Sequence, residues 1–202
     1  GIRFAYQTGR ESGRYTILET VGGGLALFDY DLDGRADLFC AGGGLIDSQT
    51  SIPSGVPCGM FQNQGAGQFR VVTNQAIAKA VIGYSHGCTA GDLNNDGFPD
   101  LLVTCYGTNC LLINQGDGTF RDATEHAGVA LATWNTAAAF GDIDRDGNLD
   151  IFICGYVDWT PDSKVQPPRD AKGQPDIPAP QSFSPVADHL LLSQGDGSFR
   201  DC

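Results

Sequence analysis

A nine-residue pattern that is rich in aspartate occurs three times in this chain, with glycine at its sixth position each time. The three copies span residues 29–37, 92–100 and 142–150. A short run of apolar or small residues precedes each copy, and a run typical of a β-strand comes directly after it. Copies that recur in the same local context are typical of a repeat architecture, so this pattern restricts the fold more than any other feature of the chain.

A second motif alternates with these Asp loops. It is a Gln-Gly turn that is preceded by apolar residues and followed by phenylalanine, at residues 63–69, 114–120 and 193–199. Apolar residues on either side of a glycine-containing turn predict a β-hairpin. Each unit of roughly 50 residues then holds four short antiparallel strands, which is the content of one β-propeller blade. The sequence therefore predicts an all-β fold built from propeller blades.

The whole chain, 1–202, is expected to be a partial β-propeller of about three blades, with approximate units 1–75, 76–125 and 126–202. The third unit is longer because residues 156–188 hold most of the ten prolines. Proline cannot donate a hydrogen bond to a sheet, so we expect this segment to be an insertion that leaves the blade. Propellers close with about four blades or more. The chain is therefore expected to be a three-blade portion of a longer propeller, or a subunit that assembles with copies of itself.

The Asp loops are candidate calcium sites. Oxygen ligands at alternate positions suit a hard cation, and glycine at position 6 permits a sharp turn. Positions 1, 3, 5 and 9 would supply side-chain oxygens and position 7 a main-chain carbonyl. We expect about three Ca²⁺ ions, held by Asp29, Asp31, Asp33, Arg35 (carbonyl) and Asp37; by Asp92, Asn94, Asp96, Phe98 (carbonyl) and Asp100; and by Asp142, Asp144, Asp146, Asn148 (carbonyl) and Asp150.

Two alternative interpretations of these loops are an EF-hand and a turn that holds no metal. An EF-hand needs glutamate at position 12 and flanking helices, but position 12 is Cys40, Val103 or Ile153, within a strand-type run. Turns rich in Asp and Gly also form without any metal. Three copies in phase favour calcium over that alternative. The second site should be the weakest, because Asn94 keeps an oxygen at position 3 but lacks the charge.

The charge balance excludes some partners. The chain has 24 acidic and 12 basic side chains, a formal net charge of −12. A nucleic-acid backbone needs a basic face, so no nucleic-acid partner is expected. No run of about 18 apolar residues occurs, so no membrane span is predicted. Apolar residues make up 41% of the chain, which is enough for a packed core.

Four of the seven cysteines occupy equivalent places in two units. Cys40 and Cys58 flank the connection between the second and third strands of unit one, and Cys105 and Cys110 flank the same connection in unit two. Strands that face each other place side chains about 5 Å apart, within reach of a disulfide. The sequence predicts Cys40–Cys58 and Cys105–Cys110 disulfides, with free buried thiols as the alternative. The pairing of Cys88, Cys154 and Cys202 stays open.

A family resemblance rests on particular segments. Phe140-Gly141-Asp142, before the third loop, resembles the FG-GAP/VCBS repeats of integrin-α-type β-propellers. Residues 1–4 and 18–34 look like the opening of secreted proteins typified by cartilage acidic protein, the ASPIC/UnbV-associated family. Residues 155–158 and 188–199 are similar to the third unit of that family. The resemblance implies a propeller of usually seven blades in a secreted protein. The ASPIC/UnbV segment itself does not occur in this chain.

No catalytic constellation emerges from the sequence. Residues 83–87 match the nucleophile elbow G-x-S-x-G, but they run into the second Asp loop and not into a helix. We therefore expect a non-enzymatic, calcium-stabilised extracellular binding or adhesion module, secreted or on the cell surface. Its partner would be an extracellular protein or a glycan. The alternatives are a structural subunit of a self-associating assembly or filament, and a carbohydrate-active propeller enzyme. Long loops on rigid scaffolds carry recognition, so the insertion 156–188, with Trp159 at its mouth, is the expected specificity element.

Overall fold

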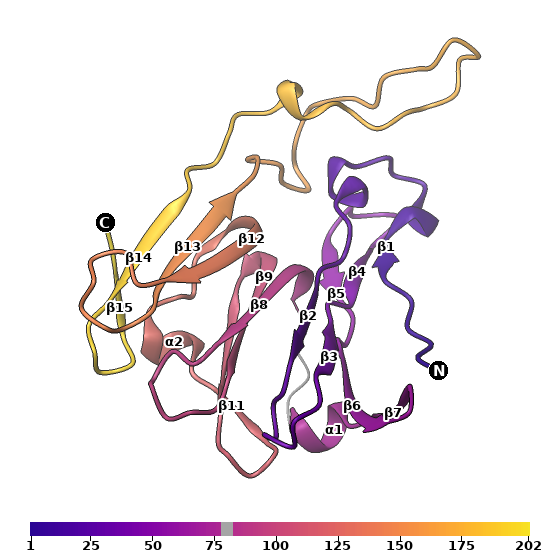
Figure 1. Ribbon diagram of the computed structural model, residues 1–202. Coiled ribbons are helices and arrows are strands. Elements are labelled where there is room, and N and C mark those ends of the chain that lie inside the picture. Colours follow the sequence, from indigo (N-terminus) through magenta and orange to yellow (C-terminus); the bar gives the residue numbers. More distant parts are fainter. Residues whose placement is uncertain (78–82) are drawn as a thin grey trace.

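The computed structural model describes residues 1–77 and 83–202, and three four-stranded antiparallel sheets follow one another along its chain (Figure 1). Each sheet starts with the strand that enters an Asp loop. The first contains β2 (Leu25–Phe28), β3 (Asp37–Cys40), β6 (Gly59–Gly65) and β7 (Gln68–Val71). The second contains β8 (Tyr84–Gly91), β9 (Asp100–Thr108), β10 (Cys110–Asn114) and β11 (Phe120–Asp122). The third contains β12 (Ala132–Gly141), β13 (Asp150–Gly155), β14 (His189–Ser193) and β15 (Phe199–Asp201). The predicted all-β, blade-like architecture is confirmed.

The Gln-Gly motifs form the outer hairpin of each sheet. The residue before the Gln-Gly pair lies opposite the phenylalanine that ends the motif, so the turn closes on these two positions. The three closing pairs are Asn63 with Phe69, Asn114 with Phe120, and Ser193 with Phe199. The two predicted motifs therefore build the two halves of each sheet, the inner half around the Asp loop and the outer half around the turn.

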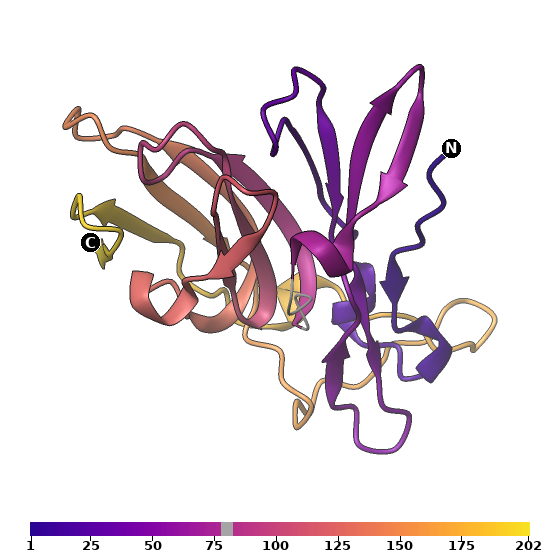
Figure 2. The same ribbon diagram turned by 90° about the horizontal axis from the view of Figure 1, so that it is seen from below.

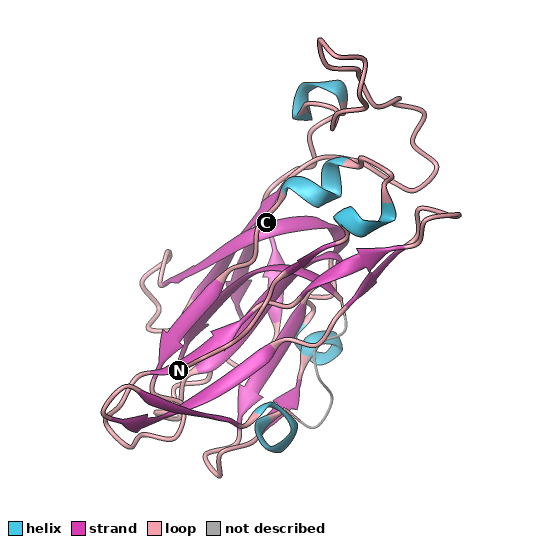
Figure 3. Ribbon diagram, turned by 90° about the vertical axis from the view of Figure 1, so that its right-hand side faces the viewer, coloured by secondary structure: helices cyan, strands magenta, loops and turns pink. Residues whose placement is uncertain are grey.

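The three sheets are fanned side by side, with the first and the third on opposite sides of the second (Figure 2). Hydrogen bonds also join the second sheet to the third, because the far end of β9 pairs with the start of β12. In that pairing Tyr106 lies opposite Trp134, and Thr108 lies opposite Ala132. The strands run along the length of the molecule, and the short helices lie near their ends (Figure 3).

Two apolar clusters fill the spaces between the sheets. One packs Phe39 and Met60 of the first sheet against Leu101 and Val103 of the second. The other packs Leu102 of the second sheet against residues of the third, including Ile151 and Ile153. Successive side chains of a strand point to opposite faces, so β9 serves both clusters. The middle sheet is therefore covered on both faces, and each end sheet on only one.

The outward faces of the two end sheets expose apolar side chains. Leu25 and Leu27 of β2 are 59% and 63% exposed, whereas Phe28 on the inward face is buried. Phe152 of β13 is 40% exposed, although the equivalent residues of the other two sheets, Phe39 and Leu102, are fully buried. These end faces repeat the inter-sheet packing pattern, but no sheet of the described residues covers them.

The connection between β3 and β6 holds structure that the repeat pattern did not predict. It contains a hairpin of β4 (Gly43–Ile46) and β5 (Pro53–Gly55), and β1 (Gln7–Thr8) adds to β4 in parallel. The 3₁₀ turns η1 (Arg10–Ser12) and η2 (Ile17–Thr20) follow β1. The first sheet therefore has a small second layer at one end.

The proline-rich insertion leaves the third sheet and folds back over this N-terminal layer (Figure 1). All of residues 156–188 are described, and they contain two isolated bridges and η3 (Pro180–Ser182) in place of a strand ladder. Trp159 and Phe183 of the insertion pack in one apolar cluster with Ile17 and Leu18 of η2. The segment is a packed excursion and not a free loop.

The helices are single turns that end two of the sheets. They are α1 (Thr73–Ala76), after β7, and α2 (Thr124–Ala127), after β11. In residues 1–77 and 83–202 no helix is long and apolar enough to cross a bilayer.

All seven cysteines are free thiols in this structure, so it forms neither of the predicted disulfides. Strand register gives the reason. Cys110 lies opposite Val103, so Cys105 sits diagonally from it. Diagonal neighbours are about 7–8 Å apart, beyond the usual Cα separation of a disulfide. Cys40 lies opposite Gly59, which leaves Cys58 outside the ladder.

The buried thiols sit in the core between the first two sheets. The Cys58 Sγ atom lies 3.5 Å from the Ser85 hydroxyl. Burial raises the pKa of the Cys88 thiol to about 12, and it also raises the pKa of Cys58 and Cys105. A thiol that stays protonated is a poor nucleophile, so these side chains act as small apolar groups.

Candidate metal centres

The three Asp loops share one backbone conformation. The residue at position 4 is left-handed in each loop, at Leu32, Asn95 and Arg145 with φ of 55°, 57° and 65°. A side chain disfavours this region by about 1–2 kcal/mol, so something must hold the turn in place. The glycine at position 6 has an even larger positive φ, of 84° at Gly34 and 90° at both Gly97 and Gly147.

The first aspartate of each loop holds the turn. Asp29 accepts hydrogen bonds from the backbone N–H groups of Asp33, at 3.0 Å, and Gly34, at 2.8 Å. Asp92 and Asp142 accept the equivalent pairs from positions 5 and 6 of their own loops. A carboxylate that accepts backbone N–H groups fixes an otherwise unsatisfied turn, so each loop is shaped by its own first residue.

The aspartate at position 9 joins the two halves of each sheet. Asp100 is fully buried, and its two oxygens accept the backbone N–H groups of Leu93, in the loop, and Asn114, in the outer hairpin, each at 2.9 Å. Asp37 and Asp150 make the same two bonds in their sheets. The sequence predicts these three residues as metal ligands. It does not indicate that they also join the loop to the hairpin.

Burial dominates the charge state of Asp100 and Asp37. Desolvation raises the pKa of Asp100 to about 6, although the two backbone hydrogen bonds oppose the shift. The pKa of Asp37 is raised for the same reason. A nearby cation would favour the charged form of both carboxyl groups.

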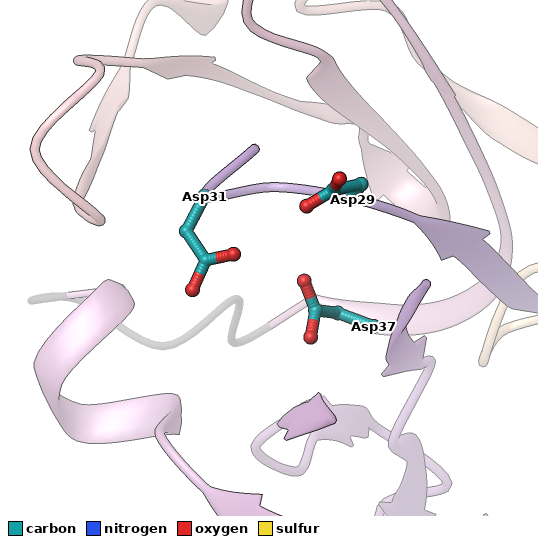
Figure 4. A group of neighbouring side chains, drawn as sticks. All are labelled: Asp29, Asp31 and Asp37. Carbon is teal, nitrogen blue, oxygen red and sulfur yellow. The ribbon is translucent and has the colours of Figure 1, made fainter. Parts of the chain in front are cut away.

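The first loop gathers three carboxylates. Asp29, Asp31 and Asp37 each place an oxygen within 4.8 Å of the others, and their carboxylates point toward one another (Figure 4). The Asp31 Oδ1 atom is buried and has no hydrogen-bond partner among residues 1–77 and 83–202, whereas Oδ2 accepts the side-chain amide of Gln62. A buried carboxylate oxygen without a partner is costly, and a cation would satisfy it. The residues therefore fit a hard cation such as Ca²⁺.

The third loop gathers its carboxylates at the surface. Asp142, Asp144 and Asp146 also have oxygens within 4.8 Å of one another, and all three residues are exposed. The side-chain and backbone N–H groups of Asn148 both donate to Asp146, at 3.0 and 2.8 Å. These hydrogen bonds lower the pKa of Asp146, which keeps it charged. Asp150 lies outside this cluster.

The second loop lacks such a cluster among the described residues. The Asn94 amide donates to Asp96, at 2.9 Å, and so occupies an oxygen that a cation would need. The backbone of Phe98 donates to the same carboxylate. In the first loop Arg35 contacts Asp33 through its guanidinium and its backbone N–H, and Asp33 stays outside the cluster. The first and third loops thus each gather three carboxylates, and the second loop does not.

Asparagine side chains connect the loops of neighbouring units. The Asn114 amide donates to the Tyr30 carbonyl in the first loop, at 2.8 Å. The Asn95 amide donates to the Gly147 carbonyl and to the Asn148 side chain in the third loop, at 3.3 and 3.2 Å. The repeat pattern did not indicate these contacts, because they join residues far apart in the sequence.

The comparisons with known proteins bear on the repeats. A search of curated proteins found no match. One solved structure that the chain resembles is an Agrocybe aegerita lectin, described as specifically recognising non-reducing terminal N-acetylglucosamine, at 18% identity and a TM-score of 0.37. The similarity covers 90% of this chain and 51% of the lectin chain, so the present chain spans about half the length of that structure. The family model described as FG-GAP-like repeat matches residues 29–103 and 92–153, which include all three Asp loops. The chain therefore belongs to the FG-GAP-like repeat family.

Proposed function

We propose that this chain is a calcium-stabilised, non-enzymatic binding module that works outside the cell. The observation that carries the proposal is the buried Asp31 Oδ1 atom, which has no partner in the part of the chain that the structure describes and faces two further carboxylates. In this proposal the first and third loops bind Ca²⁺ more tightly than the second. The ion neutralises the clustered carboxylates and rigidifies the turns, and it takes no part in chemistry.

An extracellular location follows from the same proposal. Oxygen sites of extracellular modules bind Ca²⁺ at about 10⁻⁴–10⁻³ M, a range that cytosolic calcium does not reach. The acidic composition, with a net charge of −12, agrees with a calcium-loaded secreted protein. The free thiols lend no support to this location. The closer resemblance to secreted proteins typified by cartilage acidic protein is part of the proposal.

Thermal unfolding of metal-stripped protein, with and without Ca²⁺, tests the proposal. A ligand present at 100 times its dissociation constant stabilises the folded state by about 2.7 kcal/mol, so a clear rise in melting temperature is expected. Asp31→Asn should remove the part of this rise that the first loop contributes. The control is Asp162→Asn, an equal change of charge in the insertion. An unchanged melt on addition of Ca²⁺, or equal effects of the two variants, would contradict the proposal.

A second candidate function is self-association through the end sheets. It is favoured by the exposed apolar faces that carry Leu25 and Leu27 at one end and Phe152 at the other. These faces have the character of the buried inter-sheet contacts, so another blade would cover them as the middle sheet covers its neighbours. Light scattering should then show assembly that weakens in Leu27→Thr. A monodisperse monomer at all concentrations would exclude this function.

A further inference from the structure

Two strained residues mark a cavity away from the Asp loops. Among the residues that the structure describes, six non-glycine residues have positive φ, and four of them lie in the turns of the repeats: Leu32, Ala66, Asn95 and Arg145. The other two are Tyr15, with φ of 55°, and Ser51, with φ of 61°, and both line the same cavity. Ser51 closes the β4–β5 turn, where its backbone N–H donates to the Asp47 carbonyl at 2.9 Å. Tyr15 lies outside the hairpin turns, and strained backbone of this kind is found preferentially at functional sites.

The cavity lies between the N-terminal layer and the proline-rich insertion. Its volume is about 380 Å³, within the range of small-molecule sites. Residues 13–17 and Ser51 form one side, and the insertion forms the other. Trp159 and Phe183 are its aromatic members from the insertion. Four prolines stiffen the insertion side because their φ angles are fixed: Pro161, Pro167, Pro175 and Pro178.

Arg14 gives the cavity its charge, since it is the one ionisable cation among the described lining residues. Its Nε atom donates to the Ser51 hydroxyl at 2.7 Å, and Ser51 is only 6% exposed, so the guanidinium is oriented by a buried partner. Within residues 1–77 and 83–202 the ion pairs are Arg35 with Asp33 and His189 with Asp201. The outer edge of the Arg14 guanidinium is therefore open to a ligand.

An acid that lies close enough to Arg14 to feel its charge already has hydrogen-bond partners. Asp47 feels the charge of Arg14, but its carboxylate accepts hydrogen bonds from Gln49 and Thr50, at 3.0 and 2.7 Å from their backbone nitrogens. Half of the 12 basic residues lie in residues 1–20 or in the insertion. The two segments that form the cavity thus hold half of the basic residues, and Arg14 is the one that lines it.

The lining selects a class of ligand. A guanidinium edge pairs with a planar carboxylate through two parallel hydrogen bonds. The Ser163 hydroxyl and the Gln166 side-chain amide supply further polar groups, and Tyr15 and Trp159 supply flat apolar ones. A pyranose that carries a carboxylate matches this combination, because it offers a planar anion, several hydroxyls and an apolar ring face. An acidic peptide would use the guanidinium, and its amide groups can also pair with Ser163 and Gln166, but it lacks the apolar ring face.

We propose that this cavity binds the carboxylate-bearing sugar of an acidic glycan, with Arg14 pairing the carboxylate and Ser51 positioning Arg14. This site deepens the proposed binding function and rests on it. It lies in the segment that the sequence indicated as the specificity element. Arg14, Tyr15 and Ser51 carried no sequence signal, because they come from the N-terminal layer and from the β4–β5 connection.

The test titrates the full, Ca²⁺-loaded chain with methyl glucuronide and follows amide shifts by NMR. Methyl glucoside, which lacks only the carboxylate, and an acetylated glutamate peptide are the comparison ligands. We expect shifts in residues 13–17 and 159–183 with methyl glucuronide alone. Arg14→Gln should weaken binding about tenfold or more, as loss of a charge-assisted pair does. Arg10→Gln, the same change outside the cavity, should leave binding unchanged, and Ser51→Ala should give an intermediate loss.

Each other outcome overturns the site. If methyl glucoside bound as tightly as methyl glucuronide, Arg14 would not recognise the carboxylate. If the glutamate peptide bound as tightly, the cavity would not be selective for a sugar. Absence of shifts, or equal effects of the two arginine variants, would exclude the cavity. Melting curves with and without Ca²⁺ on the same samples separate this failure from that of the calcium proposal. A normal calcium response without sugar binding overturns the site alone, and sugar binding without a calcium response overturns the calcium proposal alone.

Discussion

The need for glycine in the left-handed turn can be tested by substituting alanine at two glycines of the third unit. Gly147, at position 6 of the third loop, has φ of 90°, and a Cβ atom built on it meets nothing within 4 Å. Gly141, just before the same loop, also has open space around a Cβ but no positive φ. Steric contacts are thus equal, and the two substitutions to alanine differ only in backbone strain.

The expected cost follows from that difference. Gly147→Ala should lower the free energy of unfolding by about 1–2 kcal/mol, because an L side chain disfavours the left-handed region. Gly141→Ala, in strand β12, should raise it by about 0.4–1 kcal/mol, since alanine restricts the unfolded chain. If Ca²⁺ requires the strained turn, the same strain should weaken calcium binding to this loop by about 5- to 30-fold, at 1.4 kcal/mol per tenfold change.

Urea unfolding in saturating Ca²⁺, followed by circular dichroism, measures both variants against the unaltered chain. The slope of the free energy against urea should not change, because the exposed surface on unfolding is the same. Calcium titrations of the folded variants supply the affinity change. Equal stabilities for Gly147→Ala and Gly141→Ala would refute the argument, because they would mean that the loop does not need its left-handed glycine.

Three further predictions concern the core, the pH response and the thiols. Phe39→Ala should cost about 3–5 kcal/mol, whereas Phe152→Ala at the equivalent exposed position should cost about 1 kcal/mol or less; equal urea midpoints would contradict the assignment of end faces. In EGTA the raised pKa of Asp100, about 6, means that the folded state binds more protons than the unfolded state between about pH 4 and 6. The stabilisation that comes from this raised pKa is therefore present at low pH and is lost as pH rises through 6, by up to about 3 kcal/mol. The Asp100→Asn variant should lack this dependence of stability on pH. An NMR titration that places the pKa of Asp100 near 4 would exclude the effect. A thiol reagent should label exposed Cys202 quickly and buried Cys58 only in urea, and fewer than seven reactive thiols in urea would show that disulfides do form.

The parts of the fold that the sequence could predict are those encoded over a few residues. An Asp loop and its flanking strands lie within one short segment, so the order of Asp29, Gly34 and Asp37 was sufficient to predict the turn. The disulfides failed for a related reason. Spacing along the chain placed Cys105 and Cys110 on facing strands, but the diagonal offset between them depends on register, which the hairpin residues did not specify.

The parts that could not be predicted join distant segments. The cavity at Arg14 exists because the insertion folds back over η2, a packing that no local motif encodes. The asparagine contacts between loops are of the same kind. The convergence of carboxylates in the first loop, and their separation in the second, follow from side-chain hydrogen bonds that position numbers alone do not show.

The bond between the position-9 aspartate and the outer hairpin has a consequence for how these repeats can vary. Asp100 accepts a hydrogen bond from the main chain of Asn114 and none from its side chain. The residue at this place in the turn can therefore be replaced without loss of the bond that joins the two halves of the sheet. Ser193 illustrates this freedom, because its backbone still donates to Asp150 at 2.9 Å. Its hydroxyl accepts the N–H of Gly195, as the side-chain oxygen of Asn114 accepts the N–H of Gly116. Serine there keeps the turn intact, and Asn114 adds a hydrogen bond to the first unit through its amide.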